Sequence, residues 1–288
     1  MGTGCRRAIL FLLFSPLFGT GFAQTETPVK VDKPLKSYSH WYFGAEYGVP
    51  FLFGDFTSFS ADKTYVGSQF GGFAGYQVNS WIGIEASART GYTRMGAKSY
   101  AGDYLMNADG MTYYTNQDFN TWKYKDVFSK VHFTNIGLQM NLNVNNFFGP
   151  NRGNRRWTVL LSPAVYAQHF STELINKADK SPLSGKKTDK WNIGIGGDVS
   201  LRYKISRAFD VQLRTGIIWV NNNKMDGIST LIKSKDHFMT SAGLSLIWKV
   251  GKKKEDNVLY ASRRAADMEI RYIEERAVSL PAPACCVE

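Results

Sequence analysis

Residues 236–250 spell DHFMTSAGLSLIWKV, a stretch in which apolar and small polar residues alternate from Phe238 onward. One face is largely apolar and the other is small and polar; the first consists of Phe238, Thr240, Ala242, Leu244, Leu246 and Trp248, and the second of Ser241, Gly243 and Ser245. A period of two residues predicts a β-strand. Because a strand of a soluble β-sandwich shows the same alternation, the rest of the chain must decide which kind of sheet this strand joins.

Seven more segments with this alternation precede it. The predicted strands are residues 40–53, 68–78, 81–95, 130–146, 157–171, 190–204, 208–221 and 236–250. Short turns follow the second, fourth and sixth strands, whereas long loops follow the first, third, fifth and seventh, at residues 54–67, 96–129, 172–189 and 222–235. Transmembrane β-barrels show this asymmetry, with short periplasmic turns and long extracellular loops. An even strand count then predicts that both termini are periplasmic.

The two faces of the predicted strands differ in polarity. Charged residues lie opposite the apolar faces, at Glu46, Glu85, Arg89, Asp198, Arg202 and Arg214. A soluble barrel would have an apolar interior, whereas acids and arginines can pair inside a small membrane barrel. Tryptophans near strand ends, Trp41, Trp191, Trp219 and Trp248, fit aromatic girdles.

We therefore predict an all-β fold, an eight-stranded antiparallel up-and-down transmembrane β-barrel with a short C-terminal periplasmic helical tail. The barrel is expected to span residues 40–250. Side chains just fill the interior of eight strands, so no open pore is expected. The alternative is a soluble β-sandwich, in which the charged residues would cover an exposed sheet face.

The last predicted strand adds a more specific pattern. Ser241, Gly243, Leu246 and Trp248 fit the polar-x-Gly-x-x-apolar-x-apolar ending of Gram-negative outer-membrane barrels. Residues 40–250 thus resemble the small eight-stranded family that includes the OmpA transmembrane domain and OmpX. The resemblance implies insertion into the outer membrane, contact with its lipid and lipopolysaccharide, and a terminal signal read by the barrel-assembly machinery. It implies little about activity, because one fold hosts many functions.

The segments outside the barrel have separate predictions. Residues 1–23 are expected to be a secretory signal peptide, with a positive start and an apolar core at residues 8–18, and residues 24–39 a periplasmic lead-in. Residues 251–288 form a predicted periplasmic tail, in which an apolar stripe over residues 255–280 predicts an amphipathic helix. Such a helix is marginal alone in water, so we expect it either to dock on a periplasmic partner or to stay a solvated tail.

Composition narrows the chemistry. The formal charge is +11 but is spread along loops and the tail, which argues against nucleic-acid binding. No cysteine lies between residues 24 and 284, so no disulfide framework is expected, and adjacent Cys285 and Cys286 are either an unpaired chain end or a crosslinking pair. The four histidines show no metal-ligand spacing, and no phosphate loop or dinucleotide fingerprint is present, so neither a metal nor a cofactor is expected.

One triplet suggests enzymatic chemistry. His169 and Ser171 share the outward face at the end of the fifth predicted strand, and Glu173 follows in the next loop. This arrangement resembles the site of outer-membrane lipid A deacylases, in which a His is the base, a Ser the nucleophile and an acid orients the His. Thr172 follows Ser171, where that family usually has Asn, and the family's acid comes from the neighbouring strand. An enzyme is therefore the lesser expectation.

The leading expectation is a structural or surface-interaction barrel. Its longest loop is rich in aromatic residues that bind ligands well, including Tyr104, Tyr113, Tyr114, Trp122 and Tyr124. The alternative for these side chains is that they pack on one another and on the barrel rim. A second alternative for the whole chain is an accessory barrel of an outer-membrane secretion machine of the type IX kind, docked through residues 255–280.

Overall fold

The computed structural model describes residues 38–98, 105–113, 121–148, 155–183, 187–221, 225–230, 237–252 and 255–261. The predicted signal peptide, Cys285 and Cys286, and residues 262–280 of the predicted tail helix lie outside the described residues, so their predictions stay open. Among the residues described, no helix is long and apolar enough to cross a membrane.

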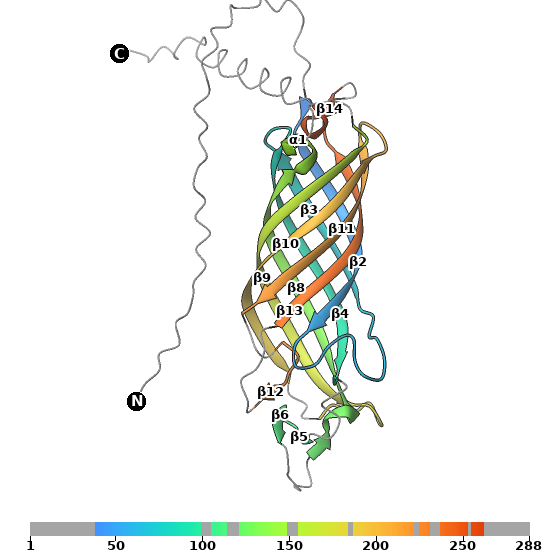
Figure 1. The fold of residues 1–288 in the computed structure, drawn as a ribbon, viewed down its shortest axis with the longest axis vertical. Coiled ribbons are helices and arrows are strands. Elements are labelled where there is room, and N and C mark those ends of the chain that lie inside the picture. The colour runs from blue at the N-terminus through green and yellow to red at the C-terminus, as the bar shows by residue number, and fades with distance from the viewer. Residues whose placement is uncertain are drawn as a thin grey trace, which may run out of the picture. The chain divides into compact units, whose positions relative to one another are not determined.

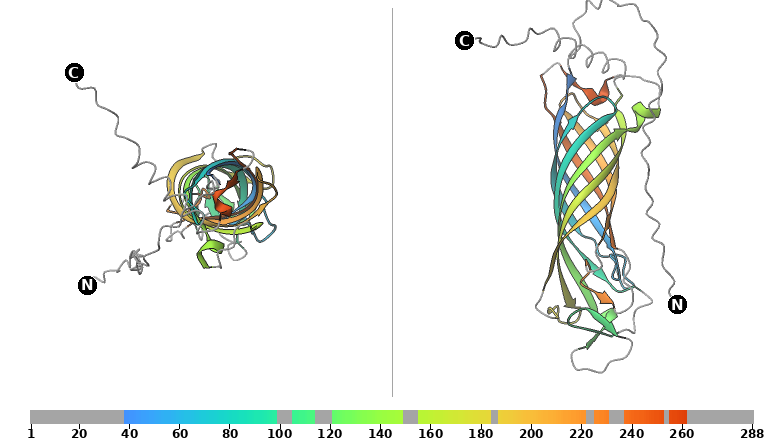
Figure 2. Two further views of the ribbon diagram at one scale, coloured as in Figure 1. Left: turned by 90° about the horizontal axis from the view of Figure 1, so that it is seen from above. Right: turned by 90° about the vertical axis from the view of Figure 1, so that its left-hand side faces the viewer.

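Eight long antiparallel strands form a closed barrel (Figures 1 and 2). They follow one another around the wall in chain order, and β13 pairs with β2 to close the ring. The strands are β2 (Trp41–Phe53), β3 (Ser68–Gln77), β4 (Ile82–Gly96), β8 (Val127–Asn143), β9 (Trp157–Asn176), β10 (Thr188–Lys204), β11 (Phe209–Val220) and β13 (His237–Lys249). The predicted fold class is confirmed, and the main difference is that β8 begins earlier and β9 ends later than the sequence indicated.

Short elements lie at both ends of the barrel (Figure 1). We call the half nearer to residues 78–81, 144–148 and 205–208 the turn half; it carries β1 (Tyr38–Ser39), α1 (Val144–Phe148), β14 (Asp256–Asn257) and η3 (Val258–Tyr260). The opposite, loop half carries β5 (Leu105–Asn107), β6 (Met111–Tyr113), β7 (Thr121–Lys123), η2 (Tyr124–Asp126) and β12 (Ser229–Thr230). β6 lies in the predicted loop 96–129 and β12 in the predicted loop 222–235. The two strands pair, so these loops are hydrogen-bonded to each other.

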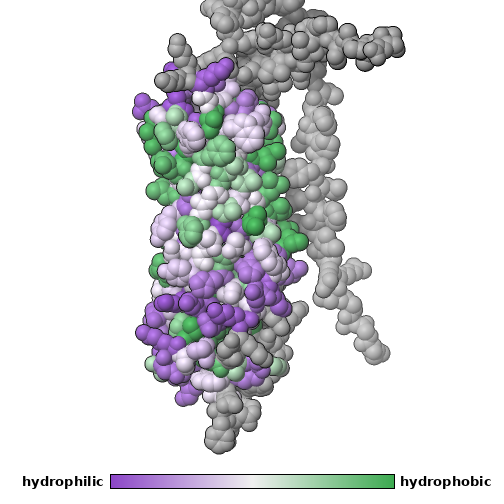
Figure 3. All heavy atoms as spheres, turned by 180° about the vertical axis from the view of Figure 1, so that it is seen from behind, coloured by the Kyte–Doolittle hydropathy of each residue, from purple (hydrophilic) through white to green (hydrophobic). Residues whose placement is uncertain are grey.

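A belt around the outer surface is mainly apolar. Exposed tryptophans lie toward both ends of the wall, with Trp41 and Trp248 in the turn half and Trp191 and Trp219 in the loop half. Figure 3 shows an apolar belt on one face, with hydrophilic side chains above and below it. The alternation predicted for β13 is confirmed, since Leu246 and Trp248 are exposed while Ser241 and Gly243 face inward.

The wall changes polarity on both faces at about the same level. Along β8, from the turn half to the loop half, the outward side chains change from apolar to polar: Leu138, Ile136, His132 and Lys130. The inward side chains change from polar to apolar over the same stretch: Gln139, Asn135, Phe133 and Val131. Along β4 the inward side chains likewise pass from Glu85 and Arg89 to Met95. The predicted polar interior therefore holds for the turn half and is wrong for the loop half.

The interior of the loop half is a hydrophobic core. Inward side chains of the strands, such as Leu52, Phe133 and Phe170, pack there with loop side chains. The loop residues in this core include Phe56, Met106, Tyr124, Met225 and Ile228. The loops thus fill the loop half from within, as in a soluble barrel.

Glycines on the inner face make room for large side chains. A Cβ on Gly75 would lie 2.1 Å from Cζ of Tyr42, whose ring lies over Gly75 on the inner face of the wall. A Cβ on Gly216 would lie 1.9 Å from Oδ1 of Asp198. Gly72 is different, because it faces outward. The atom nearest to a Cβ added there would be the Gly44 carbonyl oxygen, at 3.5 Å.

We expect Gly75→Ala to destabilise the barrel by about 1–3 kcal/mol, because the added methyl group displaces the Tyr42 ring from a filled interior. Urea unfolding of the purified protein in lipid vesicles, followed by the gel mobility of unboiled samples, measures the change. Gly72→Ala on the same strand is the matched control and should leave the midpoint nearly unchanged. Equal midpoints for the two variants would contradict the packing described here.

Candidate functional sites

Buried ion pairs cross the lumen of the turn half. Arg214 Nη2 donates to Oε1 of Glu85 at 2.8 Å, and its Nη1 lies 3.6 Å from Oε2 of Glu46 and 3.7 Å from Oδ2 of Asp198. Arg89 lies between two of the same acids, with Nε 3.3 Å from Glu46 Oε1 and Nη2 3.0 Å from Asp198 Oδ2. All five side chains are at least nine-tenths buried. The structure therefore brings together residues of β2, β4, β10 and β11 that the sequence predicted as an interior network.

Neutral groups complete the contacts of Glu85. Its carboxylate accepts hydrogen bonds from the Tyr42 hydroxyl at 2.9 Å, from Gln139 Nε2 at 2.7 Å and from Asn141 Nδ2 at 3.0 Å. Arg202, the sixth predicted residue, stacks on the Tyr42 ring with Cζ 4.8 Å from the centroid. Buried charges are tolerated when they are both paired and hydrogen-bonded, and this layer supplies hydrogen bonds to Glu85.

The network balances its charge. Three acids, Glu46, Glu85 and Asp198, face three arginines, Arg89, Arg202 and Arg214, so their formal charges sum to zero. A neutral, tightly contacting layer holds the strands in register and fills the lumen. We assign it a structural role, because every charged group in it is buried and so has no access to a substrate.

Arg214→Met should lower the free energy of unfolding by about 3–5 kcal/mol, because it leaves Glu46 and Glu85 buried beside one cation fewer. Urea titration in lipid vesicles measures the loss. The control is Arg94→Met, which removes an exposed arginine on the outer face of β4 and should cost no more than about 0.5 kcal/mol. A small effect at Arg214 would show that water reaches the network.

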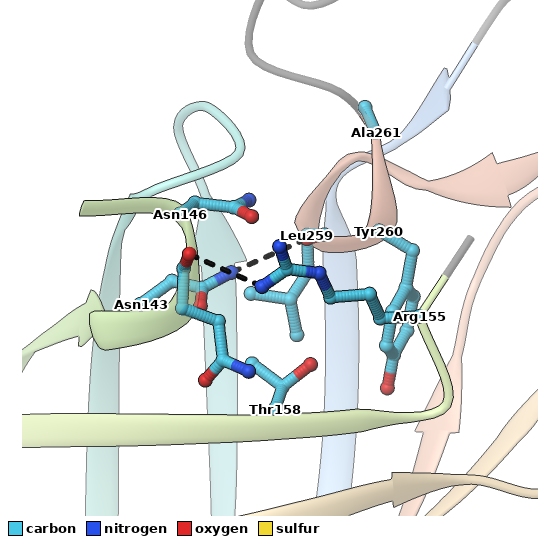
Figure 4. Close-up of a pocket in the computed structure, with 8 residues that line it drawn as sticks. Asn143, Asn146, Arg155, Thr158, Leu259, Tyr260 and Ala261 are labelled. Carbon is cyan, nitrogen blue, oxygen red and sulfur yellow. Dashed lines mark hydrogen bonds between the residues drawn. The ribbon is translucent and has the colours of Figure 1, made fainter. Parts of the chain in front are cut away.

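Residues 255–261 fold across the end of the turn half. This differs from the prediction, which had the tail helix begin here. β14 pairs in parallel with β1, and Leu259 is buried against Leu160 inside the barrel mouth. Figure 4 shows η3 facing the α1 end of β8, where Asn143 Nδ2 donates to the Leu259 carbonyl oxygen at 3.4 Å. Leu259, the first residue of the predicted apolar stripe, is therefore part of a plug and not of a free helix.

Tyr260 anchors this plug to the barrel. Its hydroxyl donates to Oδ2 of Asp210 at 2.7 Å, and the ammonium groups of Lys204 and Lys249 lie 4.9 and 4.8 Å from its ring centroid. Burial raises the pKa of the Tyr260 phenol above its usual range, so the hydroxyl remains a donor. The local sequence did not reveal this contact, because Asp210 and Tyr260 lie fifty residues apart.

The aromatic residues proposed as binding elements of the long loop have mixed outcomes. Tyr124 is buried, and its ring packs edge-on against Phe56 at 4.6 Å, so it stabilises the core instead of binding a ligand. Trp122 is half-buried against the same core. Tyr104 and Tyr114, and the side chain of Tyr113, lie outside the described residues. The packing alternative holds for the two that can be placed.

Asp226 joins two loops in the loop half. Its Oδ2 accepts from the Phe56 amide at 3.0 Å, and its Oδ1 accepts from the Ile228 amide at 3.0 Å. Burial raises the pKa of the Asp226 carboxyl, although nearby His237 opposes the shift. The sequence pattern did not single out Asp226 or His237.

His169 and Ser171 face outward from β9 as predicted, but the acid beside His169 is a different one. Glu173 lies opposite Lys130 of β8, whereas Oδ1 of Asp189 on β10 is in ion-pair contact with Nε2 of His169. Asp189 is also the cross-strand partner of Ser171. Within the described part of the chain, no hydrogen bond joins Ser171 to His169.

No protein-family model and no curated protein matches the sequence. Solved structures with a similar arrangement of strands include Neisserial surface protein A, at 12% identity over 73% of this chain and 97% of that chain, with a TM-score of 0.42. Ail, the attachment invasion locus protein of Yersinia pestis, has 9% identity over 74% of this chain and 100% of that chain, with a TM-score of 0.39. A major outer membrane protein from Thermus thermophilus has 11% identity over 73% and 99% of the two chains, with a TM-score of 0.42. Similarity at this level shows the arrangement of the strands and carries no function over to this chain.

Proposed function

We propose that this chain is an outer-membrane barrel of the structural and surface-interaction type, closed to ions, with its loop half outside the cell and its turn half toward the periplasm. The exchange of polarity along the wall carries the proposal. An apolar exterior around a charged interior suits lipid, whereas a polar exterior around an apolar core suits water. The loop half therefore projects from the membrane.

The loop half supplies the surface for interaction. Phe59 and Val66 are exposed there, and a nearby hollow is lined by three lysines and two aspartates, Lys98, Lys125, Lys177, Asp62 and Asp126. One of these lysines already pairs with Asp62, at 2.9 Å between Lys177 Nζ and Oδ2. A mixed surface of this kind suits a polar ligand with an acidic group, and long loops on a rigid barrel are common binding elements.

Lipid contact is proposed at the outward edge of the same half. Arg94 of β4 and Lys130 of β8 are cross-strand neighbours just beyond Tyr92 and His132. Basic side chains at this level suit the phosphate groups of lipopolysaccharide. Recognition of Ser241, Gly243, Leu246 and Trp248 by the barrel-assembly machinery is likewise proposed from the terminal pattern alone.

Cysteine labelling of intact cells tests the orientation. With Cys285 and Cys286 replaced by Ser, Val66→Cys in the loop half should react with a membrane-impermeant maleimide, because its side chain is exposed outside. Arg207→Cys, at the exposed turn after β10, should react only after the outer membrane is permeabilised. The reverse pattern would show that the barrel is inserted with the opposite orientation, and labelling of both sites in intact cells would exclude the proposed topology.

A second candidate is a lipid-directed hydrolase, and one observation favours it. Asp189 stands on the neighbouring strand, where an orienting acid is needed, and touches His169. Ser171 could then act as nucleophile on an ester of a lipid at the membrane edge, with His169 as base. The accessory-subunit alternative has no such support, since residues 255–261 form the plug and the rest of the predicted helix lies outside the described residues.

The hydrolase candidate predicts that the purified protein removes an acyl chain from lipid A. Ser171→Ala should lower the rate of this reaction at least a hundredfold. Mass spectrometry of the lipid counts the acyl chains. Ser206→Ala, at an exposed turn in the other half, is the control and should keep the activity. Unchanged lipid A with the parent protein would remove this candidate and leave the surface-interaction proposal standing.

A further inference from the structure

Three residues from three separate segments meet in the core of the loop half. Asp55 follows β2, Asp226 lies between β11 and β12, and His237 begins β13, at the end of the barrel that carries β5, β6 and β12 (Figure 1). One ligand atom from each, a carboxylate oxygen or a ring nitrogen, lies within 4.8 Å of the others. The chain therefore concentrates two acids and an imidazole at one point.

The imidazole at this point lacks hydrogen-bond partners. His237 is fully buried, and among the described residues neither Nδ1 nor Nε2 has a partner. Buried polar groups are nearly always satisfied, so a buried imidazole without a hydrogen-bond partner points to a water or an ion at this place. Its Nε2 lies 3.5 Å from Oδ2 of Asp226, a carboxylate that two backbone amides hold in place.

Gly54 leaves the approach to these atoms free of side chain. A Cβ at this position would lie 2.7 Å from His237 Nε2 and 2.9 Å from Asp226 Oδ2. Any other residue would therefore press on both candidate ligand atoms. Glycine is the residue that permits a close backbone approach of this kind.

We propose that Asp55, Asp226 and His237 bind a divalent transition-metal ion, for which zinc is the best fit, and that the ion ties two loops to β13. One imidazole nitrogen and two carboxylate oxygens form a set that zinc accepts, with a fourth position left for water. The imidazole disfavours calcium and magnesium, which prefer oxygen ligands alone.

The distances are compatible with a small closure of the site. Tetrahedral zinc with bonds of about 2.0–2.2 Å needs ligand atoms about 3.4 Å apart. The pair formed by Asp226 and His237 already meets this at 3.5 Å. Asp55 is the half-buried member of the three, and its carboxylate lies within 4.8 Å of the other two ligand atoms, so a small shift of this group would complete the set.

The competing explanation is a simple ion pair, in which protonated His237 faces Asp226 without a metal. That explanation predicts no response to zinc. Binding in detergent does not depend on the membrane orientation proposed above, so the two proposals can fail separately.

The experiment uses the full chain without a polyhistidine tag, with Cys5, Cys285 and Cys286 replaced by Ser so that thiols cannot bind the metal. After treatment with a chelator, the protein is titrated with Zn²⁺ by calorimetry, and elemental analysis counts the bound ions. We expect one ion per chain and a higher urea midpoint in its presence. No heat of binding and no shift of the midpoint would overturn the proposal.

Variants locate the site. Asp55→Ala and His237→Asn should each weaken zinc binding at least tenfold, whereas His132→Asn, which changes an exposed histidine on the outer face of β8, should leave it unchanged. If His237→Asn fails to give the folded mobility on gels, Asp55→Ala carries the test, because its side chain is only half-buried. Full affinity in Asp55→Ala, or an equal loss in His132→Asn, would show that the ion binds elsewhere.

Discussion

The buried pairing of Arg89 and Arg214 with three carboxylates is the constraint on which the turn half depends. Each of these charges, buried without a partner, would carry a large desolvation penalty. Each strand must therefore place its charged residue at the same level as a residue of opposite charge. Arg89 reaches Asp198 across 109 residues of chain, and Arg214 reaches Glu85 across 129. A register shift of one residue would turn such a charge toward lipid. The ion pairs therefore specify the closed barrel more than they stabilise it.

The loop half obeys the opposite rule because its surroundings differ. Once the wall leaves the lipid, water covers its outer face, and an apolar interior becomes the favourable arrangement. β8 and β9 show the consequence, since at 17 and 20 residues they are longer than the roughly 9–11 residues that a membrane crossing needs. Their extra length builds a soluble type of core, and loop residues such as Phe56 and Tyr124 complete it from inside.

The sequence was sufficient to predict the eight strands, because alternation is a local signal that every strand repeats. It also identified Glu46, Glu85, Arg89, Asp198, Arg202 and Arg214 as inward residues, since charges opposite apolar faces have few other places. It could not reveal the contacts between distant segments, such as Asp189 with His169 or Tyr260 with Asp210, which depend on strand register. The loops were the least predictable part, because the same aromatic composition suits a binding surface or a buried core.

The polarity exchange also separates the ion-pair network of the turn half from the proposed metal site of the loop half. Along β4 the boundary falls between Arg89 and Met95, so Glu46 and Glu85 lie on the side of the apolar outer belt and are buried. Asp226 and His237 lie beyond that boundary, beneath loops that water surrounds. The zinc site proposed above therefore lies apart from the network of Arg214. Two clusters of buried charge in one barrel thus have different chemistry available to them, and the difference follows from their depth.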